Sequence, residues 1–191
     1  VTIVSTTDKI KGRLQFAKEL IGNVKEIKGV VLNINPRHTN VILGEKNIPI
    51  YGYTHIKDRI FDNDFLISTK SFYQTNPYQI ENLYGTAIKK AQLKATDVVL
   101  DAYCGTGTIG ISLAKNVKQV VGVELEKDAV KDAIKNAKLN NLNNICFINQ
   151  DCTEYMLKSQ KRFDVIIMDP PRKGSTNEFL EAVNQINPRT V

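Results

Sequence analysis

The stretch that decides the fold is DVVLDAYCGTGTIG, residues 97–110, where a short apolar run leads straight into a glycine-rich turn. A compact β-branched run of this kind is typical of a strand buried on both faces. The glycines, Gly105, Gly107 and Gly110, have the G-x-G-x-x-G spacing of a loop that lets a cofactor approach the backbone. The stretch predicts a strand, a cofactor loop and a helix start. A second interpretation is that the thiol of Cys104, within the loop, is a nucleophile.

The same rhythm repeats toward the C-terminus. Further compact apolar runs lie at 119–125, 144–149 and 163–169, and a helical stripe of apolar residues lies between the first two of them. Continuous apolar strands that alternate with amphipathic helices indicate an α/β fold with a doubly wound parallel sheet. We therefore expect a ligand at the carboxyl ends of the strands, near the point where the strand order switches.

The first part of the chain has a different texture. Short β-branched runs between turn residues predict a small antiparallel sheet; these runs lie at 30–34, 40–44 and 65–68. Residues 7–22 carry apolar positions near helical spacing, with Gly22 as a stop. A second helix is expected after Asn76, which can cap its free amides, with Pro77 in the first turn. We divide the chain into an α+β subdomain at 1–70 and a cofactor-binding domain at 71–191.

Composition limits the class of protein. With 191 residues, 42% hydrophobic and 24% charged, the chain has the composition of a folded globular protein. Neither a signal peptide nor a membrane helix is visible in the sequence, so we expect a cytoplasmic location. Three cysteines fit neither a disulfide framework nor a zinc site. The net charge of +6 suits a polyanionic partner and a solvated lysine surface equally. Because the first residue is Val1, we expect a piece of a longer chain.

Acidic residues end, or directly follow, the four strands predicted in the second part of the chain: Asp101, Glu124, Asp151 and Asp169. Any one of them can simply cap the following helix. A dinucleotide presents a pyrophosphate to such a loop and favours an uncharged, amide-rich turn. S-adenosylmethionine presents an ammonium and a sulfonium, for which carboxylates are useful. The four acids together favour S-adenosylmethionine, and a nicotinamide-dependent oxidoreductase remains as an alternative on the glycine spacing.

The last of these acids opens the segment DPPRKG, residues 169–174. Two prolines without amide protons can hold their carbonyls rigidly toward a pocket, or can merely end the strand. Arg172 and Lys173 can meet phosphates or water.

Four motifs in order, SFYQTN (71–76), DAYCGTGTIGISLA (101–114), VVGVE (120–124) and DPPRKG, resemble the S-adenosylmethionine-dependent RNA uracil-5-methyltransferases. That family makes 5-methyluridine in ribosomal or transfer RNA, and the resemblance covers about residues 30–191. It implies a Rossmann-like class I methyltransferase fold, with a doubly wound parallel sheet that is incomplete at the C-terminus. Carried over, it implies that cofactor-pocket positions are Gln74, Tyr103, Glu124 and Asp169, with Asp151 near the adenine and with Gly105 and Gly107 giving clearance. Thr108 stands where many relatives have asparagine.

The resemblance also implies a mechanism. A cysteine thiolate adds to carbon 6 of uracil so that carbon 5 can accept the methyl group, and a base then removes the proton at carbon 5. Cys146 is interpreted as a small buried hydrophobe, Cys152 as a helix-start thiol on the adenine side, and Cys104 as a small side chain in a close turn. In the family the nucleophile lies in an S-C-[ND]-P motif on a later strand. We expect that cysteine and the base beyond Val191, and a chain that binds S-adenosylmethionine without methylating RNA.

The expected partner is RNA, ribosomal ahead of transfer RNA, with no membrane and a monomeric state favoured. A noncatalytic module that binds RNA or S-adenosylmethionine is the second hypothesis. Some relatives hold an iron–sulfur cluster with four cysteines, which this chain cannot supply. The two histidines, His38 and His55, lack metal-ligand spacing and are interpreted as surface or structural residues.

Overall fold

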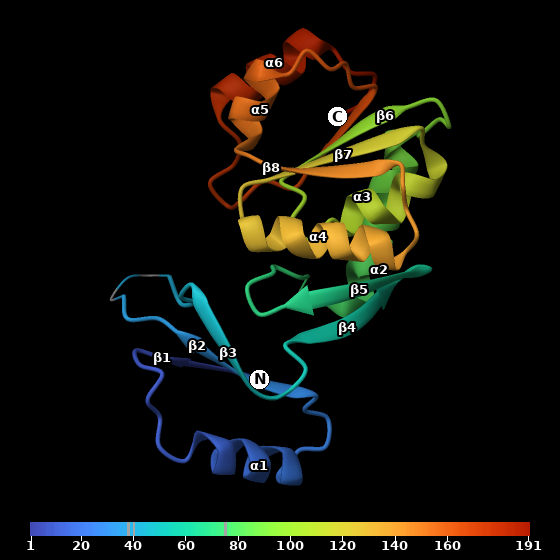
Figure 1. Ribbon diagram of the computed structural model, residues 1–191. Helices are drawn as coiled ribbons and strands as arrows, with labels where there is room; N and C mark the ends of the chain where they lie inside the picture. The colour runs from blue at the N-terminus through green and yellow to red at the C-terminus, as the bar shows by residue number, and fades with distance from the viewer. Residues whose placement is uncertain (38, 40, 75) are drawn as a thin grey trace. The chain divides into compact units, whose positions relative to one another are not determined.

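A computed structural model describes residues 1–191 except 38, 40 and 75 (Figure 1). His38, Asn40 of the run at 40–44 and Thr75 of the SFYQTN motif thus lie outside the described residues. The chain divides into two compact units: Val1–Ile56 with Ile67–Lys70, and Lys57–Leu66 with Ser71–Val191. Most of a β-hairpin, Lys57–Leu66, therefore belongs to the second unit, and a domain boundary after residue 70 stays a prediction.

The first unit has a sheet in the order β1-β2-β3. Its elements are β1 (Thr2–Ser5), α1 (Arg13–Asn23), β2 (Gly29–Ile34) and β3 (Lys46–Gly52). β2 pairs antiparallel with β3 but parallel with β1, so the sheet is mixed rather than antiparallel as predicted. Val30 and Leu32 of β2 are fully buried. The predicted helix is confirmed as α1 and runs one residue past Gly22.

The strand predicted at 40–44 is wrong over its described part, because the strand lies at β3 instead. Asn33 donates to the Gly44 carbonyl at 3.0 Å and accepts from the Gly44 amide at 2.7 Å. Asn35 donates to the carbonyls of Val41 and Ile42 at 2.7 and 2.9 Å. These backbone groups therefore pair with side chains instead of a neighbouring strand.

The second unit begins with most of the hairpin of β4 (His55–Ile60) and β5 (Asn63–Ser68), followed by α2 (Pro77–Ala91). The strand predicted at 65–68 is confirmed within β5, but it pairs with β4 in a separate two-stranded sheet and not in one sheet with β2 as predicted. Pro77 is at the first position of α2 as expected. Asn76 is at the capping position, but its side chain makes no capping bond to the described residues, so that part of the prediction is wrong.

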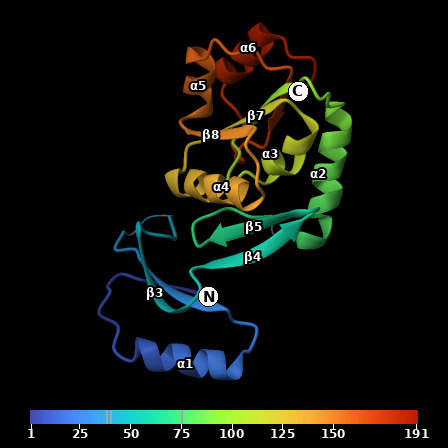
Figure 2. The ribbon, with the colours of Figure 1, turned by 45° about the vertical axis from the view of Figure 1, so that its right-hand side comes forward.

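The main sheet of the second unit is parallel throughout, in the order β8-β7-β6-β9. Its elements are β6 (Val98–Ala102), α3 (Thr108–Leu113), η1 (Ala114–Asn116), β7 (Gln119–Glu124), α4 (Lys127–Leu139), β8 (Ile145–Asn149), α5 (Cys152–Lys158), β9 (Val165–Met168) and α6 (Asn177–Ile186). Figures 1 and 2 show α3 and α4 on one face and α5 and α6 on the other. The four predicted strands and the doubly wound α/β fold are confirmed.

Burial explains this layering. Leu100 of β6, Ile166 of β9 and Phe179 of α6 are fully buried in one cluster under α5 and α6. The strand order reverses between β6 and β9, which is where ligands bind in folds of this type. Among the described residues, no helix combines the length and the apolar character that crossing a bilayer requires.

Candidate functional site

A pocket in the second unit lies at the carboxyl ends of β6 and β9. It brings together side chains from the segment before α2, from α2, from the loop after β6 and from the residue after β9. Residues that line it include Gln74, Tyr84, Asp101, Tyr103, Gly105 and Asp169. The structure therefore collects four of the predicted cofactor residues around one pocket, while Gly107, Glu124 and Asp151 do not line it. That these residues contact a cofactor stays a prediction.

The loop after β6 has a left-handed backbone at three positions: Tyr103 (φ 62°), Gly105 (φ 54°) and Gly107 (φ 79°). The Cys104 amide donates to the Val123 carbonyl of β7 at 3.0 Å, and the Gly107 amide donates to Cys104 at 2.8 Å. A left-handed conformation at a tyrosine is uncommon and persists where surrounding contacts impose it. The loop is thus a tight turn fixed to the neighbouring strand.

The two glycines that were expected to give a cofactor clearance differ in their surroundings. A Cβ on Gly107 would lie 2.7 Å from Cζ of Phe147, so this glycine leaves room for a ring of β8. A Cβ on Gly105 would meet no described atom within 4 Å, and Gly105 lines the pocket. The clearance expected at Gly107 therefore serves packing of the loop on the sheet, because the Phe147 side chain lies below the turn.

Asp101 lies at the base of the pocket and is buried. Its Oδ2 accepts a hydrogen bond from the Gly110 amide at 2.8 Å. Burial raises the pKa of this carboxyl to about 7, and the charges of Asp169 and Glu124 add to the shift, while the Gly110 bond opposes it. Asp101 is therefore a carboxyl whose charge can change near neutral pH.

Glu124 and Asp151 hold the ends of other elements. Glu124 Oε2 accepts from the Gly105 amide at 3.0 Å, and its Oε1 accepts from the Glu126 amide at 2.8 Å. Asp151 caps α5 by accepting from the amides of Thr153 and Glu154 at 2.9 and 3.1 Å. Asp151 thus has the capping role that was the simpler alternative for it, and Glu124 couples the end of β7 to the pocket loop.

Sequence reasoning missed Tyr84 as a site residue. Its hydroxyl lies 2.9 Å from Thr108 Oγ1, and its ring is buried. Burial raises the pKa of the Tyr84 phenol, Thr108 and Gln74 beside it lower that pKa, and Asp101 raises it again. Tyr84 falls on the apolar stripe of α2, so periodicity marks it as a core residue and gives no sign that its hydroxyl reaches the pocket.

Thr106 is a second residue that the sequence did not single out. It lines the pocket and is 2% exposed, and its Oγ1 has no hydrogen-bond partner among the described residues. Buried hydroxyls in folded proteins are usually paired. An unpaired one at the edge of a pocket is suited to a polar ligand.

Cys104 lines the pocket but does not have the properties of a nucleophile. Burial raises the pKa of its thiol well above the usual range, and Asp101 and Glu124 add to the shift. A Cβ on Gly122 would lie 2.9 Å from its sulfur, which shows how closely the thiol packs on β7. Cys104 is therefore a small packing side chain, as the sequence analysis concluded.

The other two cysteines have different surroundings. Cys152 begins α5, where a helix N-terminus favours a thiolate, but burial raises the pKa of its thiol to about 12; a bond of 3.2 Å from the Tyr103 amide only reduces the rise. Cys146 is exposed, not buried as predicted. β8 is the edge strand of the sheet, so its side chains have a neighbouring strand on one side only.

Comparison with known proteins adds to this geometry. Residues 93–187 match a family described as a methyltransferase domain. The chain is 48% identical over 180 residues to an uncharacterized RNA methyltransferase of Lactobacillus johnsonii, covering 91% of this chain and 40% of that protein. It is 42% identical over 194 residues to one of Streptococcus mutans, covering 100% of this chain and 43% of that protein. The chain thus spans about two fifths of the length of these relatives.

Among solved structures, the chain is similar to the Pyrococcus abyssi tRNA (uracil-54, C5)-methyltransferase in complex with S-adenosyl-L-homocysteine. The identity is 28% and the TM-score 0.77, over 98% of this chain and 44% of that one. Trm5b from the same organism, at 24% identity and a TM-score of 0.63, shows the fold alone. The predicted Rossmann-like methyltransferase fold is confirmed by these matches.

Proposed function

We propose that the chain is the cofactor-binding part of an RNA methyltransferase that transfers a methyl group from S-adenosylmethionine to carbon 5 of a uridine. The observation that carries this proposal is the pocket at the switch point of the sheet, in a chain similar over 98% of its length to a structure that holds S-adenosyl-L-homocysteine. The methyltransferase-domain match and that complex indicate the cofactor. The relatives support RNA methylation in general. The uridine target is supported by the motif resemblance.

The pocket residues fit this cofactor. Asp101 and Asp169 offer carboxylates to a ligand that carries an ammonium and a sulfonium, whereas the same carboxylates would repel the pyrophosphate of a dinucleotide. Thr106 offers an unpaired hydroxyl, and Gly105 leaves the loop open. Glu124 does not line the pocket but bonds to Gly105, which does; each of its oxygens accepts one backbone bond and keeps a second lone pair, which we assign to a ribose hydroxyl.

In this proposal the residues of the chain bind and orient, while the bound cofactor supplies an electrophilic methyl group. Asp101 provides negative charge at the base of the pocket. The contact between Tyr84 and Thr108 fixes the wall formed by α2 and α3. Cys104 and Cys152 are not available as thiolates at neutral pH because burial raises both pKa values, and Cys146 does not line the pocket. We propose that the uracil-activating cysteine is none of these three, so the isolated chain binds cofactor without methylating RNA.

Calorimetric titration with S-adenosylhomocysteine and with a nicotinamide dinucleotide tests the cofactor. We expect binding of the first and none of the second, and the reverse result would overturn the proposal. Asp169→Asn should weaken the binding of S-adenosylhomocysteine. Asp164 is an exposed aspartate before β9 that does not line the pocket, so the Asp164→Asn variant should bind the ligand as the unchanged chain does.

Substrate is tested by incubating the protein with S-adenosylmethionine and transcripts of ribosomal and transfer RNA, followed by nucleoside mass spectrometry. For the isolated chain we expect no 5-methyluridine, and its formation would refute the assignment of the nucleophile. A relative of full length should form 5-methyluridine, ribosomal RNA being the proposed substrate ahead of transfer RNA. A methylated base other than uridine would contradict the proposed target, and no methylation with retained binding would favour a noncatalytic module.

A further inference from the structure

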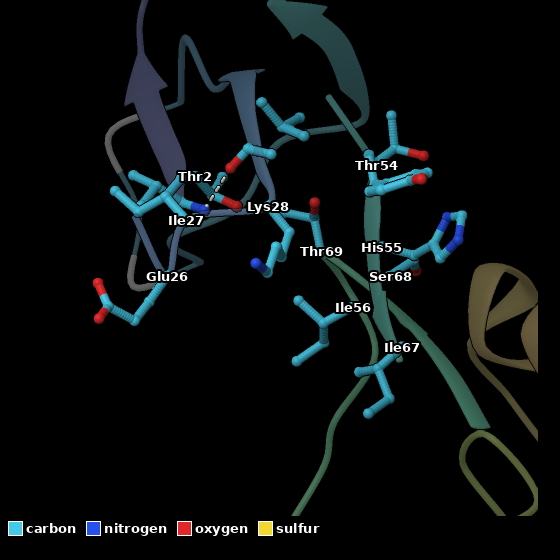
Figure 3. A pocket seen from close by; sticks show the side chains of 14 residues that line it. Thr2, Glu26, Ile27, Lys28, Thr54, His55, Ile56, Ile67, Ser68 and Thr69 are labelled. Atoms are coloured by element: carbon cyan, nitrogen blue, oxygen red, sulfur yellow. Dashed lines mark hydrogen bonds between the residues drawn. The ribbon is translucent and has the colours of Figure 1, made fainter. Parts of the chain in front are cut away.

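The first unit holds a cavity of about 400 Å³ that is separate from the cofactor pocket (Figure 3). All of its lining residues belong to that unit, and most of the lining is apolar. The size lies in the range of pockets that hold small organic groups. Figure 3 shows Lys28 and Ile56 reaching toward each other, with Ile67 beside Ile56 and the carboxylate of Glu26 pointing away. The hollow thus combines apolar walls with the positive charge of Lys28.

Tyr53 lines this cavity and leaves 66% of its surface exposed. Its ring lies 5.9 Å from that of His55, centroid to centroid, at an angle of 48°. An exposed aromatic ring beside an apolar hollow is the arrangement on which nucleic-acid bases stack in proteins that bind single strands. Thr54, Ser68 and Thr69 add hydroxyl groups to the lining.

The backbone under Tyr53 is closely packed. The Tyr53 amide donates to the Lys28 carbonyl at 3.1 Å. A Cβ on Gly29 would lie 1.8 Å from the carbonyl oxygen of Tyr53. A Cβ on Gly52, whose φ is 59°, would lie 2.2 Å from the carbonyl oxygen of Lys28. The two chain segments therefore touch through glycines, which holds the aromatic ring and the lysine on one rigid base. A backbone segment that is already held in place adds little ordering cost when its side chain binds a ligand.

The charge of the chain is concentrated in this unit. Val1–Ile56 and Ile67–Lys70 carry nine Lys and Arg residues and four Asp and Glu residues, a net charge of +5. The second unit carries seventeen basic and sixteen acidic residues, a net charge of +1. A positive unit with an aromatic-rimmed cavity fits a polyanion that also offers flat apolar groups.

We propose that this cavity binds a base of single-stranded RNA, which stacks on Tyr53 while Lys28 contacts the adjoining phosphate. Duplex RNA is a poor occupant, because its bases are already stacked on one another and are not free to enter a hollow. This inference rests on the proposed function, since it takes RNA as the partner, but the residues involved lie outside the cofactor pocket.

The test measures binding of the chain to a short single-stranded RNA that carries one 2-aminopurine, whose fluorescence falls when it stacks. Tyr53→Leu should weaken the complex by about 5- to 100-fold and abolish the quenching. Tyr51→Leu is the matched control, because Tyr51 is also exposed, lies two residues away and does not line the cavity; it should change affinity less than about twofold.

Lys28→Gln should retain the quenching and lower the slope of log affinity against log salt by about 0.7, the value for one lost phosphate contact on a single strand. Circular dichroism and the melting temperature establish that each variant is folded. If folded Tyr53→Leu binds single strands as tightly as Tyr51→Leu, the proposal is wrong. The proposal is also wrong if Tyr53→Leu weakens the binding of duplex RNA of the same sequence as strongly as it weakens the binding of the single strand.

Titration with S-adenosylhomocysteine separates this proposal from the proposed function. Loss of RNA binding in Tyr53→Leu with unchanged cofactor affinity supports the base site. If RNA binding depends on Tyr53 but the unchanged chain binds no S-adenosylhomocysteine, the proposed function fails and the base site stands.

Discussion

The buried carboxyl of Asp101 gives the sharpest test of the cofactor pocket, through the substitution Asp101→Asn and through pH. Because the pKa of Asp101 is raised from 3.8 to about 7 in the folded chain, ionising this group at neutral pH opposes folding. The protonated carboxyl stabilises the folded chain. This stabilisation is fully present below pH about 4 and is lost as the pH rises through about 7. A ligand that places a positively charged group beside Asp101, such as the ammonium of S-adenosylhomocysteine, should reverse the preference by binding the ionised form.

The size of both effects follows from the pKa. A rise of about 3 units corresponds to roughly 4 kcal/mol at most, because each unit is about 1.4 kcal/mol. Asp101→Asn should therefore stabilise the ligand-free chain at pH 8 by up to that amount, since the amide oxygen can still accept from the Gly110 amide. With a pKa of about 7, the carboxyl is about 90% ionised at pH 8 and about 10% at pH 6. Because the ionised form binds the ligand, affinity for S-adenosylhomocysteine should fall about tenfold when the pH is lowered from 8 to 6.

The assays are thermal unfolding without ligand and calorimetric titration with S-adenosylhomocysteine, each at pH 6 and pH 8. We expect Asp101→Asn to melt higher at pH 8, to bind about tenfold more weakly there, and to lose the pH dependence of binding. Asp132→Asn is a control, because this buried carboxyl of α4 does not line the pocket. Unchanged affinity in Asp101→Asn at pH 8, or a pH dependence that survives the substitution, would refute the reasoning.

Three further predictions concern other parts of the second unit. Gly107→Ala should lower the free energy of unfolding by about 2–4 kcal/mol in urea titration, because a Cβ at φ 79° would press on the Phe147 ring; wild-type stability would contradict the packing role. Iodoacetamide should label the exposed Cys146 in the native chain, with the other two cysteines labelled after denaturation, as read by peptide mass spectrometry; early labelling at Cys104 would contradict its burial. Arg189→Met should lower the melting temperature at pH 7, and the loss should shrink as acid protonates Asp97, whose pKa the Arg189 hydrogen bonds hold below its usual range; a loss that is constant with pH would exclude that ion pair.

The second half of the fold could be predicted because its signals are local. Each strand from β6 to β9 is a short β-branched run, and burial on both faces requires the whole run to be apolar. The predicted strand at 40–44 failed for the opposite reason. Its backbone is satisfied by the side chains of Asn33 and Asn35, which come from β2 and the residue after it, and no pattern inside the run announces such partners. Cys146 was misjudged similarly, since an apolar neighbourhood does not reveal whether a strand is at the edge of its sheet.

The candidate pocket was predictable only in part. Asp101, Gly105 and Asp169 line it, as the strand ends and the glycine loop indicated, whereas the other predicted acids and glycine do not, and its hydroxyl groups gave no signal. An acid after a strand is visible in the sequence because the end of the strand fixes where its side chain lies. Tyr84 and Thr106 carry no such mark, since one lies on an apolar helical stripe and the other between two glycines. Helical periodicity says that a face is buried but not what lies against it. For Tyr84 the ring faces the core and the hydroxyl meets Thr108 at the pocket, so one side chain serves both the stability of α2 and the shape of the site. Substitutions at such a position therefore have to be read with two measurements, unfolding and ligand affinity, because either alone would assign the residue to the wrong role.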